Sequence, residues 1–164
     1  MKKYTLEDFK GFERDNEGFI LCPSGDYSDI EEFPARCSFG ECCYFGNVCS
    51  FGECCSFGNV CSFGGWCSFG EWCSFGERCV FGGWCVVEAD KQLKQYAKIE
   101  GAGSERRCTY FFLLTDDRIY VRCGCFAGYE DEFVEKVKET HGGTIYEKQY
   151  LLALEFAKST FEED

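Results

Sequence analysis

The sequence is short of basic residues, of histidine and of long apolar runs, and each shortage excludes a class of function. Its 164 residues hold 17 Lys and Arg against 29 Asp and Glu, which gives a formal charge of −12. Direct nucleic-acid binding is therefore not expected, because it depends on Lys and Arg neutralising phosphates. No apolar stretch reaches the ~18 residues of a membrane span, and no secretory signal is recognised, so we expect a cytoplasmic protein without membrane contact.

Signatures of catalysis and of metal binding are also missing. One histidine, His141, cannot build a zinc site of three histidines, and no pair of cysteines has the C-x2-C spacing of structural metal sites. No nucleophile-elbow motif supports a Ser/His/Asp arrangement. We therefore expect a protein that is not an enzyme and holds neither a metal nor a cofactor.

Cysteine, phenylalanine and glycine are abundant instead, and they recur with a period of six. From residue 37 each hexad begins with Cys, carries Phe at its third position and Gly at its fourth, until the last hexad, CVVEAD. The first positions are Cys37, Cys43, Cys49, Cys55, Cys61, Cys67, Cys73, Cys79 and Cys85. Leu21, Tyr27 and Phe33 continue the third-position phase upstream.

Positions one and three lie two apart, so on an extended strand both side chains face inward. A chain that bends every six residues and keeps one face inward closes into a prism. The glycine is expected to help the chain bend. No register of five residues fits, which disfavours the four-sided solenoid of pentapeptide-repeat proteins.

This pattern resembles the left-handed parallel β-helix of hexapeptide-repeat proteins over residues 19 to 90, with Phe in place of the family's aliphatic residue. The resemblance implies a three-sided coil with three hexads per turn, so that residues 18 apart stack. Many members of that family are acyltransferases with a catalytic histidine, and others are carbonic anhydrases with three. The present repeat contains no histidine and no extruded loop. The whole chain also resembles an uncharacterised Cys-Phe-Gly repeat type of bacteriophages and gut bacteria, through its tail YVRCGCFAGYEDEFVEKVKETHG.

The flanking segments complete the predicted architecture. Residues 1–18 are expected to form a helical cap, with Thr5 as N-cap and Leu6, Phe9 and Phe12 on its apolar side. Residues 89–99 have a helical pattern, 108–115 and 118–126 a hairpin pattern, and 129–143 and 146–161 the pattern of two helices. The predicted fold is mainly β: a short left-handed three-sided parallel β-helix (19–90), an N-terminal helical cap (1–18) and a C-terminal α/β unit with a hairpin and two helices (91–164).

The cysteines have three interpretations, of which core filling is favoured. Buried Cys behaves as a small apolar residue, and its thiol ionises less readily there. A redox or metal role and disulfides within a column are the alternatives. Cys42 and Cys54, at position six, are expected to be exposed, whereas Cys123 and Cys125 are expected to share the core face of one strand.

Positions five and six vary, so they are where a repeat protein would carry a binding site. The proposed binding residues are Glu41, Glu53, Glu71, Glu77, Asn59, Trp66, Trp72 and Trp84. The spacing of 18 puts Glu53 with Glu71, Glu41 with Asn59 and Glu77, and Trp66 with Trp84. Trp is enriched among interaction hot spots. The alternative is that these aromatic side chains only shield the corners of the coil.

The combined hypothesis is a non-enzymatic inhibitor, encoded by a phage and directed against a host defence, working in the host cytoplasm. Its acidic surface would imitate DNA and occupy a basic, nucleic-acid-processing host protein. One alternative is a structural protein that self-assembles into a homo-oligomer. Another is a degenerate hexapeptide acyltransferase.

Overall fold

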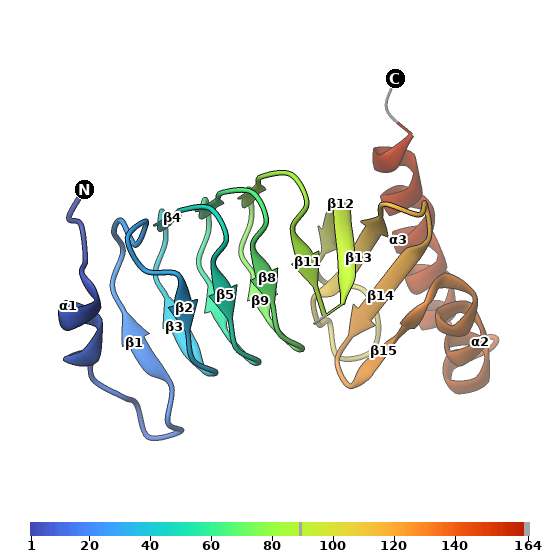
Figure 1. Cartoon of the computed structure of the whole chain (residues 1–164). Coiled ribbons are helices and arrows are strands. Elements are labelled where there is room, and N and C mark those ends of the chain that lie inside the picture. The colour runs from blue at the N-terminus through green and yellow to red at the C-terminus, as the bar shows by residue number, and fades with distance from the viewer. Residues whose placement is uncertain (89, 163–164) are drawn as a thin grey trace. The chain divides into compact units, whose positions relative to one another are not determined.

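The computed structural model describes residues 1–88 and 90–162, and it divides into two compact units. The first is Met1–Gln92 and the second begins at Leu93. The first unit is a β-solenoid of about four turns, as predicted (Figure 1). Its strands are β1 (Ile20–Cys22), β2 (Glu32–Phe33), β3 (Cys37–Phe39), β4 (Tyr44–Phe45), β5 (Ser50–Phe51), β6 (Ser56–Phe57), β7 (Ser62–Phe63), β8 (Ser68–Phe69), β9 (Ser74–Phe75), β10 (Val80–Phe81) and β11 (Val86–Val87).

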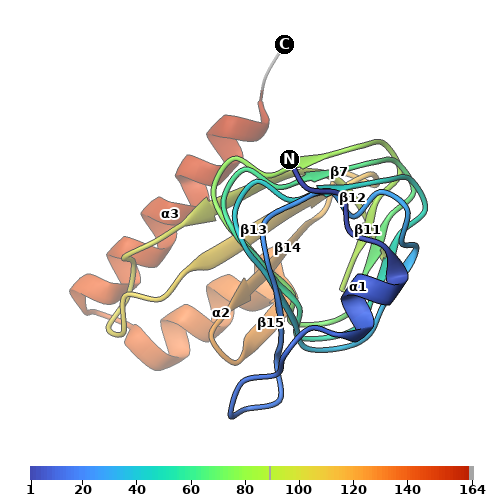
Figure 2. The ribbon, with the colours of Figure 1, turned by 90° about the vertical axis from the view of Figure 1, so that its left-hand side faces the viewer.

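These strands form three parallel ladders, one for each side of the prism. The ladders follow the orders β1-β3-β6-β9, β4-β7-β10 and β2-β5-β8-β11. From β2 onward the paired residues are 18 apart, for example Ser38 with Ser56 and Phe39 with Phe57. Three hexads per turn is therefore confirmed, and successive turns superpose when viewed along the solenoid (Figure 2).

The phenylalanine rings fill the interior as a regular aromatic lattice. Rings 18 residues apart lie parallel, as Phe33 and Phe51 do with centroids 4.8 Å apart and planes at 5°. Rings six residues apart meet edge to face, as Phe51 and Phe57 do at 4.9 Å and 89°. Each such pair contributes about 0.5–1.5 kcal/mol beyond simple area burial. Phe thus fits a three-sided core because each ring stacks along one column and abuts its neighbours edge-on.

The role of the fourth-position glycine differs from the prediction. Neither Gly58 nor Gly70 has a positive φ, but a Cβ on Gly58 would lie 2.7 Å from the backbone nitrogen of Glu41 in the preceding turn. Glycine is required for close approach of two backbones rather than for freedom to bend. Left-handed backbone occurs instead at position six. Val48 (φ 60°) and Trp66 (φ 63°) adopt it there although it is sterically unfavourable for both residue types.

The N-terminal cap is shorter than the helix predicted over residues 1–18. Helix α1 spans Leu6–Lys10, and Thr5 is its N-cap as expected, in a capping box with Asp8. Phe9 is buried and meets Phe33 edge to face at 5.5 Å. Leu6 is exposed, contrary to prediction, because a helix of one and a half turns presents only a narrow face to the core.

The first turn carries another correction. β1 pairs with β3 in a register of 17 residues, which sets Cys22 opposite Phe39. Cys22 is therefore buried and Leu21 is exposed, so Leu21 does not occupy the third-position column. A slip of one residue exchanges the two faces of a strand.

The segment predicted to be a helix is a strand, β12 (Lys91–Ile99), of which Lys91 and Gln92 belong to the first unit and the rest to the second. Ala89, the first residue of that predicted helix, lies outside the described residues. Leu93 to Ile99 pair antiparallel with β13 (Thr109–Leu114). The hydrogen bonds of this pairing outweigh the helix propensity of Lys, Gln and Ala, which is a weak local preference.

The hairpin and the two C-terminal helices follow the prediction, except that the second predicted strand, 118–126, is interrupted by a turn after Cys123. β13 and β14 (Ile119–Cys123) form the expected hairpin, and a further short strand, β15 (Phe126–Tyr129), adds to it. The helices α2 (Glu130–His141) and α3 (Ile145–Phe161) lie on one face of this sheet (Figure 1). The two helices and the sheet pack together through a core cluster that includes Phe111, Val121, Phe133, Leu154 and Ala157.

Candidate binding surface

The variable residues of the repeat lie on three separate corners of the solenoid. At each corner the position-six N–H donates to the position-five carbonyl of the next turn, as Cys42 N does to Asn59 O (2.9 Å). Cys54 N donates to Glu71 O, and Trp66 N to Gly83 O, in the same way. These bonds define an Asn-Glu corner, a Glu-Trp72 corner and a Trp corner. The proposed site residues are therefore distributed over three corners rather than gathered on one face.

The Trp corner is the most apolar of the three. It consists of Val48, Trp66 and Trp84, whose exposed fractions are 60%, 61% and 57%. The two indole rings stack with centroids 5.5 Å apart and planes at 13°. Both residues hold a left-handed backbone, and Trp66 N is tied to the next turn at 2.9 Å. The result is an exposed aromatic ridge on a rigid backbone.

The acidic residues occupy the other two corners. The Asn-Glu corner carries Glu41, Asn59 and Glu77, and the Glu-Trp72 corner carries Glu53, Glu71 and Trp72. All four glutamates are exposed. Trp72 is 39% exposed, less than the other two tryptophans. Its backbone N–H donates to the carboxylate of Glu88 over an N to O distance of 3.5 Å.

Asn59 has a structural task at its corner. Its Oδ1 accepts the backbone N–H of Glu77 at 2.8 Å, and Asn47 accepts that of Gly65 in the same way at 2.9 Å. The side chain replaces a hydrogen bond that the backbone does not make between the turns. Asn at position five therefore fastens one turn to the next, a role that the spacing alone did not indicate.

The repeat cysteines belong to the core, as predicted. All fifteen cysteines are free thiols, and the nine at position one are buried. From Cys55 onward each of these thiols lies near a carbonyl oxygen 21 residues earlier, as Cys61 does with Gly40 O (3.5 Å) and Cys67 with Gly46 O (3.4 Å). Each of these thiols thus donates a hydrogen bond to a backbone carbonyl oxygen near a corner of the preceding turn. Hydrogen bonding to Cys43 together with burial raises the pKa of Cys61 to about 12, which keeps this thiol protonated at neutral pH.

The two cysteines of the C-terminal hairpin separate, contrary to prediction. Cys123 ends β14 half-buried, and its sulfur accepts a hydrogen bond from Thr109 Oγ1 at 3.2 Å. Cys125 is exposed in the turn before β15, because Gly124 adopts a φ of 56° and reverses the chain. The two side chains therefore do not share one face of a strand.

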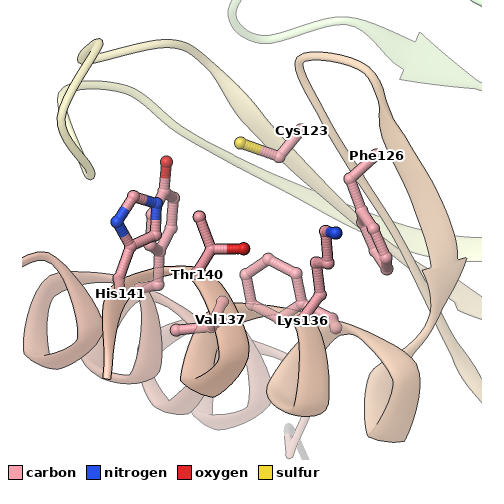
Figure 3. Close-up of a pocket in the computed structure, with 8 residues that line it drawn as sticks. Cys123, Phe126, Lys136, Val137, Thr140 and His141 are labelled. Carbon is pink, nitrogen blue, oxygen red and sulfur yellow. The ribbon is translucent and has the colours of Figure 1, made fainter. Parts of the chain in front are cut away.

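A small pocket of about 170 Å³ opens beside Cys123 (Figure 3). Lys136, Thr140 and His141 enter it from α2, whereas Cys123 and Phe126 come from the sheet. Phe133, Val137 and Tyr150 complete the lining. Burial and the nearby Cys123 raise the pKa of Tyr150 to about 12, so its hydroxyl is a donor at neutral pH. Of the lining residues, the sequence analysis had discussed Cys123 and His141, neither of them as part of a pocket.

Comparison with known proteins finds no matching family model, no similar curated protein and no similar solved structure. Within residues 1–88 and 90–162 no three His, Cys, Asp or Glu side chains are grouped as metal ligands would be. In the same ranges, no helix has the length and hydrophobicity that crossing a membrane requires. The arrangement of exposed side chains is therefore the basis for a functional proposal.

Proposed function

We propose that this protein is a non-enzymatic binding protein, and that the Trp corner is its contact surface. The observation that carries the proposal is the exposed, parallel stack of Trp66 and Trp84. Exposure of large aromatic side chains to water is unfavourable through the hydrophobic effect. A partner that covers them gains the free energy of burying that apolar surface. Trp is also among the residues whose truncation most weakens protein interfaces.

Rigidity supports this assignment. Binding costs free energy when flexible side chains and loops become ordered at an interface. The Trp corner is held by interstrand hydrogen bonds and by the aromatic lattice behind it, so little ordering remains to be done. A partner would therefore meet a surface that is already organised.

The acidic corners favour a partner with basic side chains around its aromatic-binding groove. Glu53 and Glu71 lie on successive turns of one corner, so their like charges reinforce one another. Complementary charge mainly raises the rate and the selectivity of association. We expect these glutamates to steer the partner and the tryptophans to hold it.

Imitation of DNA by a phage-encoded inhibitor of host defence is a narrower form of this proposal. Residues 37–85 contain four Glu and one Arg, three net charges over roughly 13 Å at ~4.8 Å per turn. Duplex DNA carries one charge per ~1.7 Å, about eight over the same length. Because the repeat has a lower charge density than DNA, we favour a basic protein in general as the partner over an enzyme that recognises DNA by charge alone.

The test is affinity capture from host lysate. The captured protein is then titrated into this protein, and binding is followed by the change in intrinsic Trp fluorescence. We expect the double variant W66A/W84A to lose capture and the quadruple change of Glu41, Glu53, Glu71 and Glu77 to Lys to slow association. The matched control is Val80→Ala, since Val80 is 62% exposed on a flat side of the solenoid. Equal capture by W66A/W84A and by the wild type would refute the Trp corner as the contact surface.

Self-association is the second function that the Trp corner supports. The ridge is apolar and accessible, so another copy could cover it through a symmetric contact. In that case no lysate protein is captured by way of Trp66, and light scattering of the wild type shows a larger particle than W66A/W84A. Acyl-CoA binding, measured by calorimetry, tests the remaining acyltransferase hypothesis, for which the geometry offers no support of its own.

A further inference from the structure

Helix α3 has a stripe of exposed apolar residues that lie next to the side with which it packs on its own unit. Ala153, Leu154 and Ala157 are buried in the core of the unit. Three apolar residues outside that face, Ile145, Leu152 and Phe156, are 57%, 58% and 61% exposed. Soluble helices normally present polar residues there, so three exposed large apolar residues along one line of a helix mark a contact surface.

The spacing of the stripe is that of a helix-pairing seam. Ile145, Gln149, Leu152 and Phe156 follow steps of four, three and four, which is the alternation of core positions in a heptad. Beside the stripe lies a shallow groove of about 420 Å³, whose lining includes Ile99, Ala102 and Leu152. The stripe is therefore suited to another helix laid along it.

The charges that border the stripe identify the partner. Lys148 and Glu155 are exposed, and neither makes an ion pair within the described part of the chain. They lie seven residues, or about 10 Å, apart along the helix, too far to pair with each other. In an antiparallel pair of identical helices, residues that precede core positions face one another across the seam. Lys148 then faces the partner's Glu155, and Glu155 faces the partner's Lys148.

We propose that α3 pairs antiparallel with α3 of a second copy of this chain, about a two-fold axis between residues 150 and 151. Ile145 packs on the partner's Phe156, and Leu152 packs on the stem of the partner's Gln149. The Oε1 of Gln149 accepts a hydrogen bond from Gly103 N of its own chain at 2.9 Å. The two-fold axis doubles each contact, including the Lys148–Glu155 pair. A parallel pair would place Lys148 against Ala153 and Glu155 against Thr160, and would pair no charges.

The contact is small, so the dimer is weak and concentration-dependent. The overlap of the two helices runs from residue 145 to 156, about 18 Å of helix. Contacts of this size fall below the ~1,600 Å² typical of stable complexes. We expect half-dimerisation near ~100 µM, a range that sedimentation equilibrium covers. The proposal involves only the C-terminal unit and is independent of the Trp corner.

The decisive experiment is a charge exchange in the full chain, measured by sedimentation equilibrium from about 5 to 500 µM. K148E alone and E155K alone each create two like-charge contacts, and each is expected to raise the dimer Kd about tenfold or more. The double variant K148E/E155K restores opposite charges across the seam, so its Kd should return to near that of the wild type. L152E should abolish the dimer.

Two controls keep the test decisive. Circular dichroism and thermal unfolding should be unchanged in all four variants, because the three residues are exposed and belong to no ion pair of the monomer. W66A/W84A should leave the Kd of this dimer unchanged. A wild type that is monomeric at every concentration, or a double variant as weak as the single ones, overturns the proposal.

Discussion

Replacing Gly58 by Ala tests the physical basis of the solenoid most directly. An added Cβ would lie 2.7 Å from both Glu41 N and the Gly40 carbonyl carbon, where ordinary contact begins at 3.4 Å. The turns would have to separate by roughly 0.7 Å to remove this overlap. Gly58 N donates to Phe39 O at 3.0 Å, and Cys42 N to Asn59 O at 2.9 Å, so such a separation stretches the bonds that join the turns.

Overpacking of a tight interior costs about 1–3 kcal/mol. Because backbone atoms and not a flexible side chain are in the way, we expect Gly58→Ala to lower the free energy of unfolding by about 2–3 kcal/mol. Urea unfolding followed by Trp fluorescence measures this, since all three tryptophans lie in the repeat and report on the solenoid alone.

The matched control is Gly83→Ala. A Cβ on Gly83 meets no heavy atom within 4 Å, and the residue has no positive φ. Ala there should leave stability unchanged or raise it by about 0.4–1 kcal/mol through the unfolded chain. The reasoning is refuted if Gly58→Ala costs less than about 0.5 kcal/mol, or if both substitutions cost the same.

Three further predictions concern the thiols, the corners and the cap. Ellman's reagent should quickly modify the exposed Cys42 and Cys125 in the native protein and reach the ten buried thiols only after denaturation; rapid labelling of those ten would contradict the buried columns. Val60→Asn should stabilise by about 1 kcal/mol in urea, because Val60 has φ 60°, whereas Val80→Asn, on a strand, should not. Hydrogen bonds from Thr5, the N-cap residue of α1, hold the pKa of the Asp8 carboxyl below its ordinary value. The stability that Asp8 contributes is therefore present above that ordinary value and is lost as pH falls through the lowered one, and Asp8→Asn should flatten acid unfolding curves in that range.

Prediction from sequence worked where a local pattern is repeated. Every hexad from residue 37 but the last places Cys and Phe on one side of a short strand, and neighbouring turns are of the same kind. A single rule of period six, applied many times, therefore defined the buried positions, and the resemblance to hexapeptide-repeat proteins implied that the ladders number three. The helices α2 and α3 and the hairpin of β13 and β14 were predictable for a similar reason, since each carries its own periodicity and end signals.

Prediction failed where a remote partner decides the structure. The segment 91–99 has side chains suited to a helix, but its backbone pairs with β13. β1 slips by one residue because it lies at the end of the repeat, where the pattern is degenerate. For the proposed site, the residue columns were predictable from the spacing of 18, but the hydrogen bond that Asn59 provides was not.

The amino-acid sequence by itself determined the period, the inward face and the burial of the cysteines, because these follow from side-chain alternation along a short strand. Only the tertiary structure decided why glycine stands at position four, since that depends on the distance between two backbones in neighbouring turns. It also decided that Leu21 is left exposed on β1, and that Leu152 and Phe156 are left exposed on α3. Those surfaces are set by which side of each element the rest of its unit covers, and local sequence does not specify that.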